Sequence, residues 1–181
     1  MLLPLLLLAG CGGTEEQTQK ALDLRTELLA AGGCAFDAEV QISYGDTASR
    51  FSARCVYSQT DGVTMTLTAP QTLSGMTARV DGSGAKLVFD GAEIGFSTLA
   101  GGRVAPMAAP WLLADCWARG YIAYSGMEDG QLRVTYQTGY GRDALDVDVW
   151  LNDDGLPARA EISYDGALLL AAELSNFTFE A

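Results

Sequence analysis

The sequence contains no histidine, and this absence argues against several classes of enzyme. Histidine is the usual general base near neutral pH, and it completes the Ser-His-Asp and Cys-His arrangements of many hydrolases. It is also a ligand in most of the common zinc sites. Chemistry based on carboxylates or lysine remains open, but no motif indicates it. We therefore expect a protein that is not an enzyme and that holds no cofactor.

Basic residues are also scarce. Lys and Arg number 11 against 23 Asp and Glu, which gives a formal net charge of −12. Binding to nucleic acid requires a basic surface, and so does electrostatic attraction to an anionic membrane. The acidic residues are spread along the chain, as on the solvated faces of strands and turns. We therefore expect no nucleic-acid partner.

The hydrophobic run at the start of the chain is too short to cross a bilayer. It extends from Leu2 to Leu8, interrupted only by Pro4, whereas a transmembrane helix needs about 20 apolar residues. No Lys or Arg precedes Cys11, so the basic segment that usually opens a signal peptide is missing. The run still fits the hydrophobic region of a signal peptide, because small residues follow it directly.

The tetrapeptide Leu8-Ala9-Gly10-Cys11 resembles the lipobox of bacterial lipoproteins. In that class the chain is cleaved before the cysteine, whose sulfur then carries a diacylglyceryl group. Two acyl chains are enough for stable anchoring. The resemblance implies a signal peptide at 1–10, a lipidated Cys11 with a tether at 11–13, and one domain at 14–181 outside the cell membrane. The alternative is a buried N-terminal segment with a chance cysteine.

A helix is predicted directly after the tether, over residues 15–31. Thr14 is a suitable N-cap and forms a capping box with Gln17. Apolar residues then recur at helical spacing, and Gly32-Gly33 ends the helix in the manner of a C-cap glycine. The apolar residues concerned are Ala21, Leu22, Leu28 and Leu29.

From Phe36 onward the hydrophobic period changes from that of a helix to that of a strand. Asp-Gly pairs separate the alternating runs, and glycine accepts the positive φ of tight hairpin turns. Many short antiparallel strands joined in this way are typical of a curved meander, a sandwich or a barrel. The strands expected are 36–44, 51–57, 63–68, 73–80, 85–89, 92–97, 121–127, 131–138, 144–151, 158–164 and 167–179.

One apolar segment interrupts the strands and predicts a short helix over 110–119. Pro110 suits a first helical position, and Gly120 suits the end. A helix this apolar must be buried. The obvious surface for it is the concave face of the sheet.

Four short phrases resemble the superfamily of incomplete β-barrels that contains the outer-membrane lipoprotein carrier and sorting proteins (LolA- and LolB-like). The phrases are Phe36-x-Ala38, Asp61-Gly62, Pro70-x-x-Leu73-x-Gly75 and Leu87-x-x-Asp90-Gly91. Within that superfamily, the layout is most similar to the clostridial spore-germination lipoproteins. The resemblance implies a mainly β (α+β) fold: an antiparallel, curved, incompletely closed β-barrel with an N-terminal helix and an apolar helix on its concave face.

Two functions are compatible with this fold. In the first, the half-barrel holds an acyl chain or another apolar ligand between the sheet and the helix 110–119. In the second, the interior is filled by the chain's own side chains, and the protein docks an enzyme or regulator of the cell envelope or of spore germination. The residues expected to line a ligand cavity are Val40, Ile42, Leu67, Trp111, Leu112 and Trp117. Ordinary core packing is the alternative for the two tryptophans.

The cysteines and clustered aspartates were the remaining candidate sites. If the first hairpin turn is centred on Gly45-Asp46, Phe36 faces Cys55, and Cys34 lies diagonally from Cys55 on the same face. This predicts a disulfide, with two buried thiols as the alternative. Cys116 is expected to be a buried structural thiol. The acidic cluster comprises Asp143, Asp146, Asp148, Asp153 and Asp154. Its spacing matches no calcium loop, so no metal is expected.

Overall fold

The computed structural model describes residues 13–44, 47–89, 92–97, 99–100, 103–139 and 144–180. The predicted signal peptide, Cys11, the turns Gly45-Asp46 and Asp90-Gly91, and Asp143 lie outside the described residues. In chain order the elements are α1 (Gly13–Ala31), β1 (Gly33–Tyr44), β2 (Thr47–Ser58), β3 (Gly62–Ala69), the 3-10 helix η1 (Gln71–Leu73), β4 (Thr77–Asp81), β5 (Gly84–Phe89), β6 (Ala92–Phe96), β7 (Leu99–Ala100), β8 (Arg103–Val104), the 3-10 helix η2 (Pro106–Ala108), α2 (Ala109–Arg119), β9 (Tyr121–Glu128), β10 (Gln131–Thr138), β11 (Leu145–Leu151), β12 (Pro157–Tyr164) and β13 (Ala167–Glu180).

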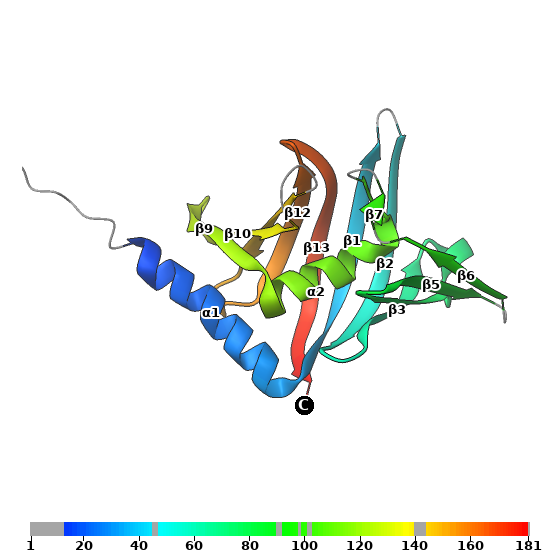
Figure 1. The fold of residues 1–181 in the computed structure, drawn as a ribbon, viewed down its shortest axis with the longest axis horizontal. Helices are drawn as coiled ribbons and strands as arrows, with labels where there is room; N and C mark the ends of the chain where they lie inside the picture. The colour runs from blue at the N-terminus through cyan, green and yellow to red at the C-terminus, as the bar shows by residue number, and fades with distance from the viewer. Residues whose placement is uncertain are drawn as a thin grey trace, which may run out of the picture.

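Eleven strands form one antiparallel sheet in the order β6-β5-β4-β3-β2-β1-β13-β12-β11-β10-β9. The sheet is open, with β6 and β9 at its two ends. Both α-helices lie on the same side of it in Figure 1, with α1 beside β9 and α2 crossing in front of the central strands. The prediction of a mainly antiparallel, unclosed β fold with an N-terminal helix is confirmed.

Helix α1 ends where the sequence predicts, because Gly32 adopts a φ of +80°, which glycine tolerates without a steric penalty. The buried stripe differs from the predicted one. It consists of Ala21, Leu24 and Leu28, at spacings of three and four residues, whereas Leu22 and Leu29 are exposed. The helix is therefore rotated relative to our expectation, and only one side of it packs on the domain.

The hairpin β1–β2 has the predicted register, with Phe36 opposite Cys55. Two of the Asp-Gly turns also have the predicted geometry. Both central residues have positive φ in the β9–β10 turn, at 50° for Asp129 and 84° for Gly130. The β12–β13 turn has the same geometry. Positive φ at both positions is what a type I′ hairpin requires.

Two predictions near the middle of the chain are wrong in detail. The strand expected at 73–80 begins only at Thr77, because Gln71–Leu73 form a 3-10 turn in which the Leu73 amide donates to the Pro70 carbonyl. The short hairpin of β7 and β8 was not expected. Strands of two residues carry too little alternation to show a period.

Arg25 connects the two helices. Its Nε donates a hydrogen bond of 3.1 Å to the carbonyl oxygen of Trp117, and its Nη2 donates to the carbonyl oxygen of Gly120. These carbonyls belong to the last turn of α2, which carries a partial negative charge and lacks partners within its own helix. Arg25 therefore fixes the end of α2 against α1.

Replacing Arg25 by methionine should lower the free energy of unfolding by about 1.5–3 kcal/mol, the range for hydrogen bonds made by a charged group. Methionine keeps the apolar stem and removes only the donors. Urea denaturation followed by circular dichroism would measure the loss. Lys20→Met on the exposed side of the same helix is the control and should change stability by less than about 0.5 kcal/mol. Equal effects of the two changes would contradict the role of Arg25.

Candidate functional site

Trp117 occupies the interior between α2 and the sheet. Its side chain is 0 % exposed, and its ring lies edge-on to Phe36 at 5.2 Å and to Phe177 at 5.7 Å between centroids. These aromatic partners come from β1 and β13, the two central strands. Trp117 thus fills the space in which the ligand hypothesis places a cavity.

The remaining space under α2 is small. A gap of about 160 Å³ lies between Leu113 of α2 and Val40, Ile162 and Leu170 of the sheet, and it is too narrow at every point for a water molecule. Of the residues predicted to line a cavity, Val40, Ile42, Leu67, Leu112 and Trp117 are buried in one hydrophobic core, and Trp111 is partly buried against it. The structure therefore brings all six residues to the same core, and their role in holding a ligand stays a prediction.

The three cysteines that the structure describes, Cys34, Cys55 and Cys116, are buried. Cys34 and Cys55 lie on the same face of the β1–β2 hairpin, as the sequence predicts, and the disulfide between them stays a prediction. Burial raises the pKa of Cys55 and of Cys116 well above the usual range. Because the thiolate is the reactive form of cysteine, these two thiols are inert at neutral pH.

The outer face of β10, β11 and β12 carries a network of cross-strand pairs that the sequence analysis missed. Asp148 accepts two hydrogen bonds from Arg133, at 3.0 and 2.9 Å, and a third from Thr135. Trp150 lies between two guanidinium groups, with Arg159 at 4.4 Å and Arg133 at 5.6 Å from its ring centre. The acidic residues of β11 therefore have partners within the sheet. Among the residues that the structure describes, no group of three or more metal-ligating side chains is placed to hold a metal ion.

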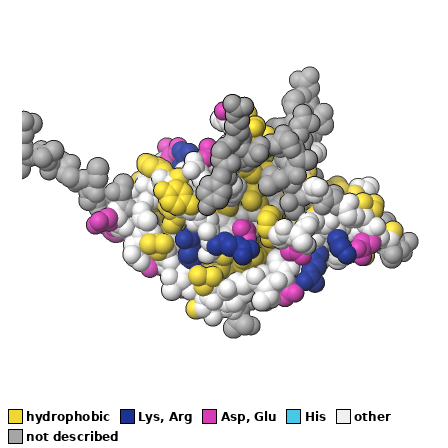
Figure 2. All heavy atoms as spheres, viewed as in Figure 1, with side chains coloured by type: hydrophobic (Ala, Val, Ile, Leu, Met, Phe, Trp, Pro, Cys, Tyr) yellow, Lys and Arg dark blue, Asp and Glu magenta, His cyan; other side chains and the backbone are white. Residues whose placement is uncertain are grey.

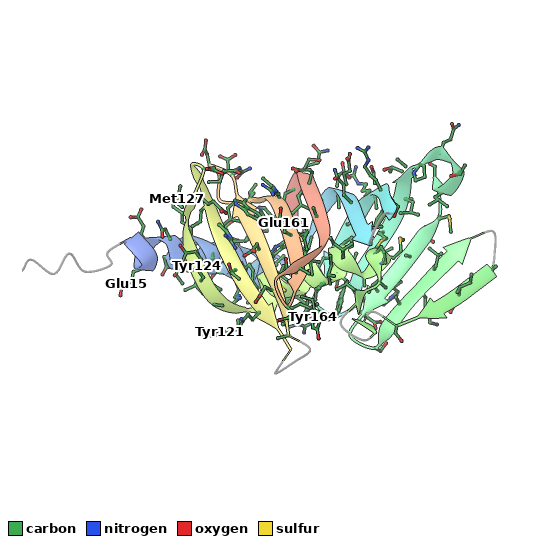
Figure 3. All side chains as sticks on the ribbon, turned by 90° about the horizontal axis from the view of Figure 1, so that it is seen from above. Glu15, Tyr121, Tyr124, Met127, Glu161 and Tyr164 are labelled. Carbon is green, nitrogen blue, oxygen red and sulfur yellow. The ribbon has the colours of Figure 1, made fainter. Side chains whose placement is uncertain are left out.

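The exposed hydrophobic side chains of β9 form a second candidate site. Tyr121 is 71 % exposed, Tyr124 is 55 % exposed and Met127 is 57 % exposed. We call these three residues the β9 patch. Hydrophobic side chains gather over β9 at the left of Figure 2, and Figure 3 shows the three labelled residues along this one strand. Strand β9 pairs with β10 on one side and lies at the end of the sheet.

A hollow of about 580 Å³ adjoins the start of β9. It is bordered by Tyr121, by Asp115 and Arg119 of α2, and by Gln137 and Thr138 of β10. Asp115 and Arg119 form an ion pair one helical turn apart. The hollow therefore has an aromatic wall and a polar rim, and it is large enough for a side chain of another molecule.

Neither helix, within the part of the chain that the structure describes, is long and apolar enough to cross a bilayer. The two helices instead belong to the domain itself.

The open eleven-stranded sheet with its two helices has the LolA-like fold. It resembles a crystal structure of a putative outer-membrane lipoprotein-sorting protein domain from Vibrio parahaemolyticus, with a TM-score of 0.50 and 13% identity over 92% of this chain and 93% of that one. This confirms the predicted superfamily resemblance at the level of the fold.

Two further solved structures have similar folds. One is a LolA superfamily protein from Nitrosomonas europaea, with a TM-score of 0.47 and 11% identity over 90% of this chain and 93% of that one. The other is the GerS lipoprotein of Clostridioides difficile, solved in complex with the CwlD amidase, with a TM-score of 0.47 and 12% identity over 99% of this chain and 100% of that one. No protein-family model matches the chain, and no curated protein sequence matches it significantly.

Proposed function

We propose that this protein is a non-catalytic lipoprotein, anchored through Cys11 to the outer face of the cell membrane. It acts by binding a partner protein of the cell envelope. In this proposal α2 is seated on the concave face of the sheet as a permanent part of the core. The observation that carries it is the filled interior. The gap of about 160 Å³ beneath α2 admits no water molecule, so it has no room for an acyl chain.

Binding of an apolar ligand would require α2 to leave the sheet. That movement would expose Trp117 and Leu113, which are both fully buried. Burying a large apolar side chain contributes about 1.5–3 kcal/mol, and the aromatic contacts of Trp117 add to this. Arg25 would also lose its hydrogen bonds to the end of α2. These costs favour protein docking over a ligand cavity.

Solvent extraction followed by lipid mass spectrometry tests this choice. The chain from Gly13 onward, purified without detergent, is expected to release no lipid in stoichiometric amount, and native mass spectrometry should give the mass of the chain alone. Bovine β-lactoglobulin loaded with palmitate would be a suitable positive control for extraction. A lipid recovered at one per chain would overturn the filled-interior proposal and establish the apolar-ligand function instead.

A further inference from the structure

We propose that β9 is the docking site, and that it receives an extended, basic segment of the partner as an additional antiparallel or parallel strand. This inference rests on the proposed function and specifies its surface and the chemistry of its partner. An end strand offers unpaired backbone N–H and C=O groups, which a strand from another chain can bind.

The first observation is that β9 lacks the charged side chains and proline that guard many end strands. Natural sheets guard their ends with charged side chains, proline, very short strands or a covering helix. Strand β9 has eight residues, and the stretch Tyr121–Met127 contains no charged residue and no proline. At the opposite end of the sheet, β6 has five residues, and its Glu93 forms an ion pair of 2.7 Å with Lys86. Helix α1 packs beside β9, but its hydrogen bonds to Ser125 and Gly120 involve one side chain and one carbonyl.

The second observation is the acidic border of this strand. Thr18 of α1 shares a hydrogen bond of 2.7 Å with Ser125, and Arg25 binds the carbonyl of Gly120. Helix α1 consequently runs antiparallel to β9, so its start, with the exposed Glu15 and Glu16, is at the same end of β9 as the β9–β10 turn.

The β9–β10 turn itself adds Asp129 to this border. Two guanidinium groups near the strand are bound by carboxylates of this chain, since Arg133 pairs with Asp148 and Glu128, and Arg119 pairs with Asp115. A third, Arg25, binds backbone carbonyls at the end of α2. The border therefore has an excess of negative charge, and a segment carrying Lys or Arg complements it.

The third observation is the hollow of about 580 Å³ beside Tyr121. Strand addition derives its affinity from the backbone and its specificity from pockets that take alternate side chains. The hollow is bordered by the aromatic Tyr121 and by the carboxylate of Asp115, so it offers an apolar wall for the stem of a long basic side chain and an acceptor for its charged head. Cations bind favourably over tyrosine rings.

Charge also argues against two other possible occupants of β9, a second copy of this chain and an anionic membrane surface. A second copy of this chain would bring the same net charge of −12 to the border that contains Glu15, Glu16 and Asp129, and like charges oppose association. An anionic membrane surface would repel the same groups. A basic protein segment is the occupant that this border attracts.

Two ten-residue peptides test the inference on the full-length lipoprotein in phosphatidylcholine nanodiscs. One peptide alternates valine with lysine, and the other alternates valine with glutamate. Fluorescence anisotropy measures affinity, and hydrogen exchange locates the amides that become protected. We expect the lysine peptide to bind at least tenfold more tightly than the glutamate peptide and to slow exchange in β9. Raising the salt concentration should weaken it.

Matched variants assign the binding to β9. Tyr124→Lys places a guarding charge on β9 and should reduce affinity for the lysine peptide at least tenfold, whereas Ile94→Lys on the exposed face of β6 should leave it unchanged. The double change Glu15→Gln and Glu16→Gln removes only charge, and it should weaken binding severalfold with the fold intact. Circular dichroism of each variant checks the fold.

Several outcomes would overturn the inference. They are equal affinity for the two peptides, equal effects of Tyr124→Lys and Ile94→Lys, protection of β6 in place of β9, or a dimer that protects β9 without peptide. Slower hydrogen exchange in β9 when phosphatidylglycerol nanodiscs are present without peptide would show that the strand binds the membrane. This result would also overturn the inference. A protein free of extractable lipid that binds neither peptide would refute strand docking while the proposed function stands.

Discussion

Replacing Trp117 by alanine is expected to lower the free energy of unfolding by about 3–5 kcal/mol, the range for truncating a buried aromatic side chain. Trp117 is fully buried, and its ring contacts Phe36 and Phe177 from two different strands. Removal of the indole leaves a cavity that these neighbours cannot fill without moving the sheet. Such a loss is a large part of the stability of a typical domain.

Urea denaturation followed by circular dichroism would measure this effect on the chain from Gly13 onward. Tyr121→Ala removes an aromatic ring of similar size from an exposed position and should change stability by less than about 0.5 kcal/mol. A loss below about 1 kcal/mol for Trp117→Ala would mean that the region under α2 repacks easily. That result would favour an adaptable ligand cavity over a fixed core.

Replacing Cys11 by alanine should transfer the protein from the membrane fraction to the soluble fraction. The diacylglyceryl group predicted for Cys11 would supply two acyl chains, and two chains anchor stably where one does not. The net charge of −12 does not favour binding of the protein to an anionic membrane surface without the anchor. The loss of membrane association is therefore expected to be nearly complete.

Ultracentrifugation of cell membranes, followed by immunodetection of the protein in both fractions, would measure the transfer. Cys116→Ala alters a cysteine of α2 that lies in the core and should leave the protein in the membrane fraction. A Cys11→Ala variant that still sediments with membranes would contradict the lipobox prediction. It would also show that another part of the chain binds the membrane.

The strand register could be predicted where a turn fixes it. Placing a turn at Gly45-Asp46 was sufficient to put Phe36 opposite Cys55, because side chains in a hairpin alternate with a period of two residues. The helix at 110–119 was predictable from its apolar composition between Pro110 and Gly120. Its end at Arg119 was predictable from Gly120. The hydrogen bonds of Arg25 to that end were not, because Arg25 is about 90 residues away in the sequence and binds there only in the folded chain.

The candidate sites were harder to predict from sequence. The sequence around an apolar residue such as Val40 or Trp117 looks the same whether the residue lines a cavity or fills a core. The hydrophobic period of a strand or helix shows which face is buried, but it does not show how closely the side chains on that face pack. The network of Asp148, Arg133 and Trp150 depends on the register of β10 against β11, and no Asp-Gly pair lies between these two strands to fix it. Exposure of Tyr121 and Tyr124 likewise depends on β9 being the end of the sheet.

The position of β13 has a consequence for how the chain is made. The strand order puts β13 beside β1 at the middle of the sheet, although more than 120 residues separate them along the chain. Contacts between distant segments slow folding because a long loop must first close. Until β13 is free to pair, β1 and β12 each present an unpaired interior edge. If the protein is exported as we propose, its sheet cannot be completed before nearly all of the chain has crossed the membrane, and both edges are exposed to aggregation during that interval.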